Sequence, residues 1–198
     1  MDDKRLEKQM QFIRETDKLK EIGRQNYICS GTRKENDAEH SFHLALMAAL
    51  LSEYANDKVD VAKVMTMVLI HDVIEIDAGD TYAYDAEANK SKRERELKAA
   101  DRLFHILPDD QAEYLRGLWD EFEENATPEA RFANTLDKVQ PTMLNHTSEG
   151  KSWVEHGVKF SQIMGRNTAT KDGSEKLWDY ARENYIMPHI AGEIVDDR

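Results

Sequence analysis

Apolar residues recur along most of the chain at helical spacing. In residues 3–22 they lie among charged residues at intervals that predict an amphipathic helix, which ends at the following glycine. A polar segment, residues 24–37, comes next. Residues 38–54 and 61–76 are apolar around most of their circumference, and Asp60 is a suitable N-cap for the second run. Both runs are therefore predicted to be central, buried helices.

The second half of the chain continues this helical pattern. Thr127 precedes Pro128 and Glu129, which is typical of an N-cap followed by the first turn of a helix. A tract rich in Gly, Asn, Thr and Asp separates the last two helical stretches. The helices predicted in this half span residues 90–107, 108–125, 128–145, 153–164 and 175–194.

Composition favours one helical domain. The 198 residues include only 4 Pro and 9 Gly, which leaves few turn residues for a protein of many strands. We expect an all-α fold and a single domain over residues 1–198, in which helices of residues 151–198 pack on a core formed by residues 19–145. The single Cys29 excludes an intramolecular disulfide, which fits a reducing compartment.

Charge limits the kind of partner. With 27 Lys and Arg against 39 Asp and Glu, the formal net charge is −12 at pH 7. Neutralising the phosphates of a polymer needs a basic face, so we expect no nucleic-acid partner. No stretch approaches the 18 apolar residues of a membrane span, and the charged N-terminus does not resemble a signal peptide. We therefore expect a cytoplasmic protein.

Polar residues interrupt the two apolar helices. His40 lies near the start of the first, and His71 and Asp72 lie near the C-terminal end of the second. Burying such groups without partners costs on the order of several kcal/mol. Histidines and carboxylates together are what a divalent cation binds, and Asp137, among apolar neighbours in a later helix, is the best candidate for a further ligand.

Two more carboxylates follow the His-Asp pair. Glu75 lies four residues after His71 and three after Asp72, so helical geometry places all three on neighbouring positions. Asp80 follows Gly79 in the loop that leaves the helix, where its carboxylate can point back. An adjacent His-Asp pair is, taken alone, more often a helix-dipole contact or a surface ion pair. The metal hypothesis therefore depends on the combination of these residues.

The ordered set His40, His71-Asp72 and Asp137 resembles the HD-domain superfamily of metal-dependent phosphohydrolases. Within it, the chain is similar to the branch with bacterial 5′-deoxynucleotidases and the eukaryotic HD-domain-containing protein 2. The resemblance spans about residues 19–145 and implies a helical bundle with its metal site between central helices. The segments that carry it are RKENDAEHS (residues 33–41), HDVIEIDAGD (71–80) and ATPEARFANTLDK (126–138).

The resemblance implies a metal centre and a homodimer. The centre would hold one divalent cation, and its ligand types suit Mn, Co, Fe, Ni, Zn or Mg alike. The implied ligands are His40, His71, Asp72 and Asp137.

The resemblance also implies roles around the metal. Glu75 would activate or orient the attacking water, and Asp80 would contact the sugar hydroxyl or help the leaving group. Arg33 would lie near the phosphate. Arg24 would match an upstream substrate-binding Arg that family members often place before an aromatic residue, but Gln25 follows it here. Preference between deoxyribose and ribose therefore stays open.

These features together predict a metal-dependent phosphohydrolase. The expected substrate is a (deoxy)nucleoside 5′-monophosphate, hydrolysed to nucleoside and phosphate by a metal-activated water. The net charge of −12 does not oppose this, since local metal and Arg charges decide binding over a few ångströms. Two alternatives stay open: hydrolysis of nucleoside triphosphates or guanosine polyphosphates, and a regulatory protein that binds nucleotide or metal without turnover.

Overall fold

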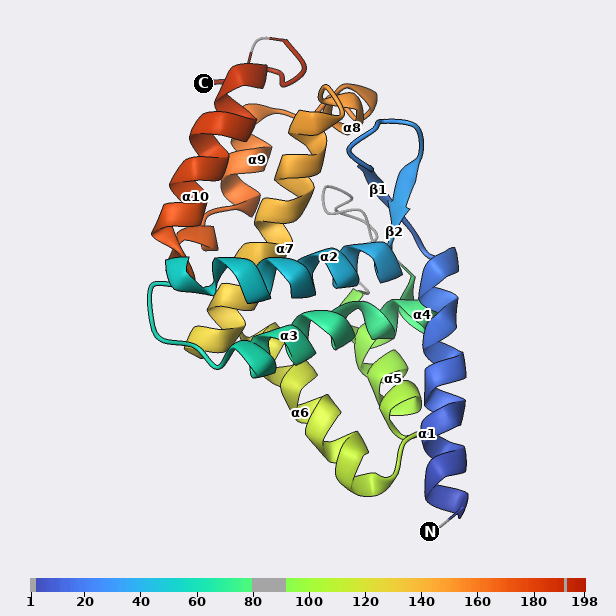
Figure 1. Cartoon of the computed structure of the whole chain (residues 1–198). Helices are drawn as coiled ribbons and strands as arrows, with labels where there is room; N and C mark the ends of the chain where they lie inside the picture. Colours follow the sequence, from blue (N-terminus) through green and yellow to red (C-terminus); the bar gives the residue numbers. More distant parts are fainter. Residues whose placement is uncertain (1–2, 80–91, 191) are drawn as a thin grey trace.

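Three helices form the middle of the molecule. The computed structural model describes residues 3–79, 92–190 and 192–198 (Figure 1). In it, α2 (Asp37–Leu51) and α3 (Val61–Ile70) lie side by side, and both pack on the long helix α7 (Pro128–Thr147). Besides helices, the described residues form a single two-stranded sheet, so the all-α prediction is confirmed.

The helix starts predicted at Asp60 and Thr127 are confirmed. The Asp60 side chain accepts a hydrogen bond from the Lys63 amide at the start of α3. Thr127 caps α7 in the same way, with Pro128 in the first turn. Each cap satisfies a backbone N–H that has no partner within its helix.

The N-terminal helix and the pair α5–α6 complete the lower part of the bundle in Figure 1. The helix predicted over residues 3–22 is α1 (Asp3–Thr16), and its last turn tightens into the 3₁₀ helix η1 (Asp17–Glu21). Phe12 of α1 stacks on Phe104, with ring centroids 6.4 Å apart. The other two helices are α5 (Lys92–Phe104) and α6 (Asp109–Glu124).

The polar segment after α1 folds as a hairpin that the sequence analysis did not predict. Strands β1 (Gly23–Tyr27) and β2 (Lys34–Asn36) pair antiparallel. Gly31 in the connection has φ of 65°, a conformation that glycine adopts without strain. The Ser-Gly dipeptide there is the turn signal that was available in the sequence. The hairpin matters because it carries Arg24 toward the central helices.

The long helix predicted over residues 61–76 is broken near its end. Between α3 and α4 (Glu75–Ala78) lies the 3₁₀ turn η3 (His71–Ile74). The His71 ring hydrogen-bonds the Val68 carbonyl through Nδ1 at 2.9 Å, which competes with regular backbone pairing at the end of α3. The tighter turn sets the directions of His71 and Asp72.

The C-terminal part is more fragmented than predicted. Two helices were expected at residues 153–164 and 175–194, but Gly157, with φ of 56°, follows the short α8 and separates it from α9. Later, regular helix gives way to a π turn and a 3₁₀ turn. The observed elements are α8 (Lys151–Glu155), α9 (Phe160–Arg166), η5 (Thr170–Asp172), α10 (Glu175–Ala181), η6 (Arg182–Ile186) and η7 (Met187–His189).

Apolar packing falls into two clusters. The larger one contains residues of α1, α2, α3, α5, α6, α7 and α10. Trp119 and Phe132 are fully buried in it. The smaller one lies in the C-terminal part and includes Trp153, Ile163 and Trp178. The short 3₁₀ turn η2 (Ser52–Tyr54) extends α2. No helix among the described residues has the length and apolar run needed to cross a membrane.

Candidate metal centre

Four of the predicted residues meet between the central helices. His40 comes from α2, His71 and Asp72 from η3, and Asp137 from α7. Ligand atoms of His40, His71 and Asp72 lie within 4.8 Å of one another. Asp137 Oδ1 lies 3.1 Å from His40 Nε2 and 3.7 Å from His71 Nε2. All four residues are buried.

The His71 ring presents a nitrogen to carboxylates. Its Nδ1 donates to the Val68 carbonyl, so in the neutral ring Nε2 carries a lone pair. Nε2 lies 3.1 Å from Asp72 Oδ1 and makes no hydrogen bond of good geometry with the described residues. Burial alone would lower the pKa of His71, but Asp72 and then Asp137 raise it above its usual value. The position therefore attracts a positive charge, which a proton or a metal ion supplies.

The His40 ring has too few hydrogens for the acceptors around it. It lies between two acceptors, Gln140 Oε1 at 3.0 Å from Nδ1 and Asp137 Oδ1 at 3.1 Å from Nε2. Burial, followed by the charge of Arg24, lowers the pKa of His40 to about 4, so the ring is neutral near pH 7 and has one hydrogen for two acceptors. A cation beside Nε2 would resolve this conflict. The donor set, two imidazoles and two carboxylates, therefore fits a divalent metal ion.

Lys138 helps to hold Asp137 ionised. Burial alone would raise the pKa of the Asp137 carboxyl, but Lys138, followed by the two neighbouring histidines, holds it well below its usual value. Lys138 Nζ lies 2.6 Å from Asp137 Oδ2. An ionised carboxylate is the form that a metal ion binds.

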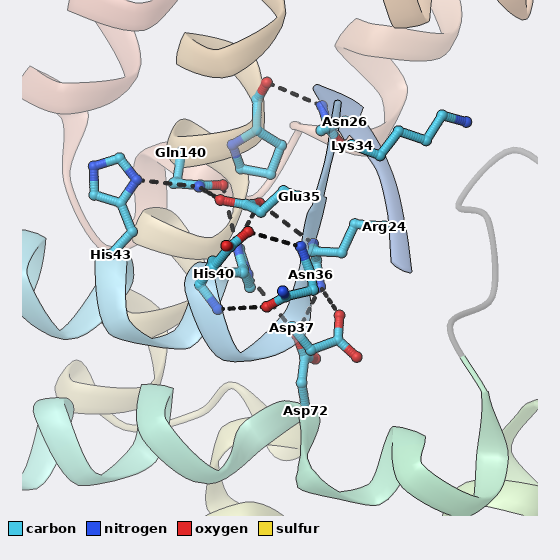
Figure 2. Close-up of polar contacts among 12 residues, drawn as sticks. Arg24, Asn26, Lys34, Glu35, Asn36, Asp37, His40, His43, Asp72 and Gln140 are labelled. Atoms are coloured by element: carbon cyan, nitrogen blue, oxygen red, sulfur yellow. Dashed lines mark hydrogen bonds and ion pairs between the residues drawn. The ribbon is translucent and has the colours of Figure 1, made fainter. Parts of the chain in front are cut away.

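Arg24 lies inside the site, where it neutralises carboxylates. Its Nη1 donates to Asp72 Oδ2 at 2.7 Å and to Asp37 Oδ1 at 3.2 Å, and its Nε lies 3.8 Å from Glu35 Oε2. Figure 2 shows the guanidinium reaching from β1 toward these groups. The predicted place of Arg24 near the site agrees with the structure, although its polar contacts are with the protein's own acidic side chains.

Glu75 lies beside the four residues. It is buried, and ligand atoms of Glu75, Asp72 and Asp37 lie within 4.8 Å of one another. Burial, and then the charge of Asp72, raises the pKa of Asp37 to about 7. Glu75 is thus placed where its carboxylate can reach a water near Asp72.

A cavity of about 180 Å³ opens beside this cluster. Three cationic residues on its wall were not assigned to the site from the sequence. Arg166 comes from α9, and Lys92 lies at the start of α5. Lys138 directly follows Asp137 in the sequence, but the motif itself gave it no role. The cationic side chains on the cavity wall, which are of the kind that binds phosphate, are therefore Arg24, Lys92, Lys138 and Arg166.

Arg33 is not where the resemblance placed it. Its side chain is 54% exposed and forms two hydrogen bonds with the Glu39 carboxylate, at 2.6 and 2.8 Å. Glu39 is itself fixed by the capping box at the start of α2, so it holds Arg33 on the outer side of that helix. Arg33 does not line the cavity. Asp80, the other predicted loop residue, lies outside the described residues.

One known protein family matches most of the chain. The family model described as HD domain matches residues 16–178. The chain belongs to the HD domain family. This confirms the resemblance drawn from the sequence, and the match extends beyond residues 19–145 on which that resemblance was based.

Named relatives point to one kind of enzyme. The HD domain chain is 28% identical over 163 residues to the human 5′-deoxynucleotidase HDDC2, covering 82% of this chain and 77% of that protein. It is 30% identical over 132 residues to the Xenopus laevis 5′-deoxynucleotidase HDDC2, covering 66% and 64%.

Two solved structures are similar to this HD domain chain. One is a predicted metal-dependent phosphohydrolase from Magnetospirillum magnetotacticum MS-1, with 48% identity, a TM-score of 0.86 and coverage of 90% of both chains. The other, a conserved hypothetical protein from Pyrococcus furiosus, has 23% identity, a TM-score of 0.61 and coverage of 87% and 99%. The second shows the fold alone.

Proposed function

We propose that the protein is a metal-dependent phosphohydrolase that converts (deoxy)nucleoside 5′-monophosphates to nucleoside and phosphate. The observation that carries this proposal is the meeting of two buried histidines and two buried carboxylates beside one cavity, with the Nε2 atoms of both rings facing carboxylate oxygens. The names of the curated relatives, 5′-deoxynucleotidases, support the substrate class.

Four side chains would hold the metal. The proposed ligands of one divalent ion are His40, His71, Asp72 and Asp137. Such an ion supplies charge to the phosphoryl oxygens and acidifies water. The structure supports its presence because each histidine has its Nδ1 engaged by an oxygen acceptor, which leaves Nε2 for the metal.

Glu75 is the proposed proton acceptor. Its buried carboxylate lies close to Asp72 without being one of the four proposed ligands, so it can take a proton from water at one of its oxygens. Asp80, proposed from the resemblance to contact the sugar hydroxyl or help the leaving group, stays a prediction.

The phosphate is proposed to bind the cations of the cavity wall. Lys138 pairs with Asp137, and Lys92 lies 3.3 Å from a carboxylate oxygen of Glu96. Arg166, by contrast, forms no ion pair within the part of the chain that the structure describes. Its guanidinium is therefore free to take the phosphate oxygens, and we assign it the role that the sequence gave to Arg33.

A substrate panel tests the proposed function. Purified protein is loaded with Mn²⁺ or Co²⁺, and phosphate release is measured from deoxynucleoside and nucleoside 5′-monophosphates, triphosphates and guanosine polyphosphates. We expect phosphate and nucleoside from monophosphates, and no activity from Asp72→Ala. Pyrophosphate or triphosphate as product would favour the polyphosphate alternative. Nucleotide binding without turnover, with metal shown to be bound, would favour a regulatory protein.

A homodimer is also proposed, with the resemblance as its basis, and the cytoplasmic location expected from the sequence stays a prediction. Phe42, Leu46 and Leu50 are exposed at four-residue intervals on α2, which gives that helix an outward apolar stripe. Such a stripe supports self-association. Sedimentation equilibrium of the purified protein tests it, and a monomer at all concentrations would contradict the homodimer.

A further inference from the structure

A chain of hydrogen bonds leads away from His40 on the side opposite Asp137. We propose that Gln140 and Glu35 position His40 for metal binding, by fixing which of its ring nitrogens carries the hydrogen. The inference rests on the proposed function, because it treats His40 as a metal ligand. In this role Gln140 and Glu35 position His40 and contact neither metal nor substrate.

Gln140 has three hydrogen-bonding contacts and no exposed surface. Its Nε2 donates to Glu35 Oε1 at 2.7 Å, and the same nitrogen lies 3.3 Å from His43 Nδ1. Its Oε1 lies 3.0 Å from His40 Nδ1. Figure 2 shows Gln140 between the two histidines, with Glu35 beside it. Both ends of this amide are therefore occupied.

The polarity of these contacts passes from one residue to the next. Glu35 Oε1 accepts from the NH₂ end of the Gln140 amide, and it can do so whether the carboxyl is ionised or carries a hydrogen on its other oxygen. The oxygen end must then face His40, where it accepts a hydrogen bond from Nδ1. With its hydrogen on Nδ1, neutral His40 presents the lone pair of Nε2 to Asp137 and Asp72. This is the tautomer that binds a metal through Nε2.

The other histidine shows why such an arrangement is needed. His71 Nδ1 bonds the Val68 carbonyl, an acceptor whose polarity cannot be reversed. A glutamine amide can turn over and exchange its oxygen and nitrogen, so Gln140 alone would allow either tautomer of His40. Glu35 removes that freedom because it accepts from the NH₂ end, and the His43 ring is compatible with this orientation when its Nδ1 carries no hydrogen. The two proposed His ligands thus reach the same tautomer by different means.

Exchanging the two side chains separates this role from simple packing. The single variants Gln140→Leu, Gln140→Glu and Glu35→Gln are compared with the double variant Glu35→Gln/Gln140→Glu. In the double variant the amide at position 35 donates to the carboxylate at position 140, which again accepts from His40 Nδ1. Polarity toward His40 is thereby kept, although both residues have changed.

Metal affinity of each variant is measured by Zn²⁺ and Co²⁺ titration of the metal-free protein against a chelator. We expect the dissociation constant to rise roughly 10- to 100-fold in Gln140→Leu, as for other residues that orient metal ligands, and to return to within about threefold of wild type in the double variant. In the Zn²⁺-loaded protein, a protected His40 Nδ1–H proton resonance is expected for wild type and the double variant, and its loss for Gln140→Leu.

Asn145→Leu is the matched control. Asn145 is a buried amide on the same helix α7, but it donates to the Pro141 carbonyl and does not line the cavity. We expect this variant to lose stability and to keep metal affinity within about twofold. If Gln140→Leu binds metal like wild type, or if the double variant is as weak as Gln140→Leu, the inference is overturned alone. A wild-type protein that binds no metal would overturn the proposed function together with it.

Discussion

Two clusters of histidines and carboxylates among the described residues differ in how the hydrogens of their rings are used. In the C-terminal cluster, His189 lies between Glu193 and His146: its Nδ1 is 2.9 Å from Glu193 Oε2, and its Nε2 is 3.0 Å from His146 Nδ1. One hydrogen on each ring satisfies this chain, since His189 donates to Glu193 and accepts from His146. No further cation is required.

In the candidate metal centre, the same residue types leave the histidine rings with fewer hydrogens than there are acceptors around them. The Nδ1 atoms of His40 and His71 already face oxygen acceptors, and their Nε2 atoms face carboxylate oxygens. Among the described residues, the groups arranged to hold a metal ion include this cluster and do not include the C-terminal one. The comparison shows that residue types alone do not define a metal site. The direction of the ring hydrogens decides it.

The largest expected difference comes from matched changes of one histidine in each cluster. His71→Gln removes a proposed ligand, so kcat/KM with Mn²⁺ should fall by about 10⁴-fold or more, together with metal content. His189→Gln should keep both within about threefold, because its partners are satisfied without a cation. Elemental analysis and steady-state kinetics on both variants measure this. Loss of metal in His189→Gln would contradict the conclusion that the C-terminal cluster has no part in metal binding.

Glu75→Ala should separate binding from turnover within the metal centre. Glu75 is not among the proposed ligands, so the metal content should stay that of wild type, whereas kcat should fall by about 10² to 10³-fold as proton transfer is lost. Single-turnover kinetics with metal content measured on the same sample provides the test. Full activity in Glu75→Ala would show that the assigned role is wrong.

The proposed ligands could be predicted because their signal is local. A histidine or aspartate that interrupts an apolar helix is visible in the sequence, and His40, His71 and Asp137 are such residues. The helices around them were also predictable, since their apolar runs and the caps Asp60 and Thr127 are encoded within a few residues.

What could not be predicted depends on distant contacts. The hairpin that brings in Arg24 has no clear alternation of apolar and polar residues, so its strands were not recognised. The 3₁₀ turn at His71 is accompanied by a side-chain hydrogen bond to the Val68 carbonyl, a contact that the apolar pattern does not encode. Arg33 was assigned from its place in a motif, whereas its direction is set by Glu39. Arg166 reaches the cavity from α9, outside the segment on which the resemblance was based.

Two arginines, one at the cavity and one at the surface, provide a matched test of substrate binding. Arg166 lines the cavity beside the metal centre, so Arg166→Ala should raise KM for a nucleoside monophosphate about tenfold, through the loss of a charged hydrogen bond. Arg33→Ala is the matched control, and KM should change less than about twofold because this arginine pairs with Glu39 at the surface. The kinetics are measured at saturating metal. A larger effect of Arg33→Ala would restore the role that the sequence gave it.

The smallest expected effect lies in the C-terminal cluster and depends on pH. The hydrogen bond from His189 lowers the pKa of Glu193 below its usual value, so the interaction stabilises the fold above that usual value and is lost as the pH falls through the lowered one. The Glu193 side chain is 38% exposed, and screening keeps its contribution below about 1 kcal/mol.

Glu193→Gln should therefore lower the free energy of unfolding slightly near neutral pH, and the difference from wild type should shrink as the pH falls through the lowered pKa of Glu193. Urea unfolding at several pH values measures it. Metal affinity should not change at any of them, because this carboxylate already receives the His189 hydrogen and completes a chain that needs no cation. A metal affinity that falls with Glu193→Gln would mean that the two clusters are coupled, against the separation argued from their hydrogen bonds.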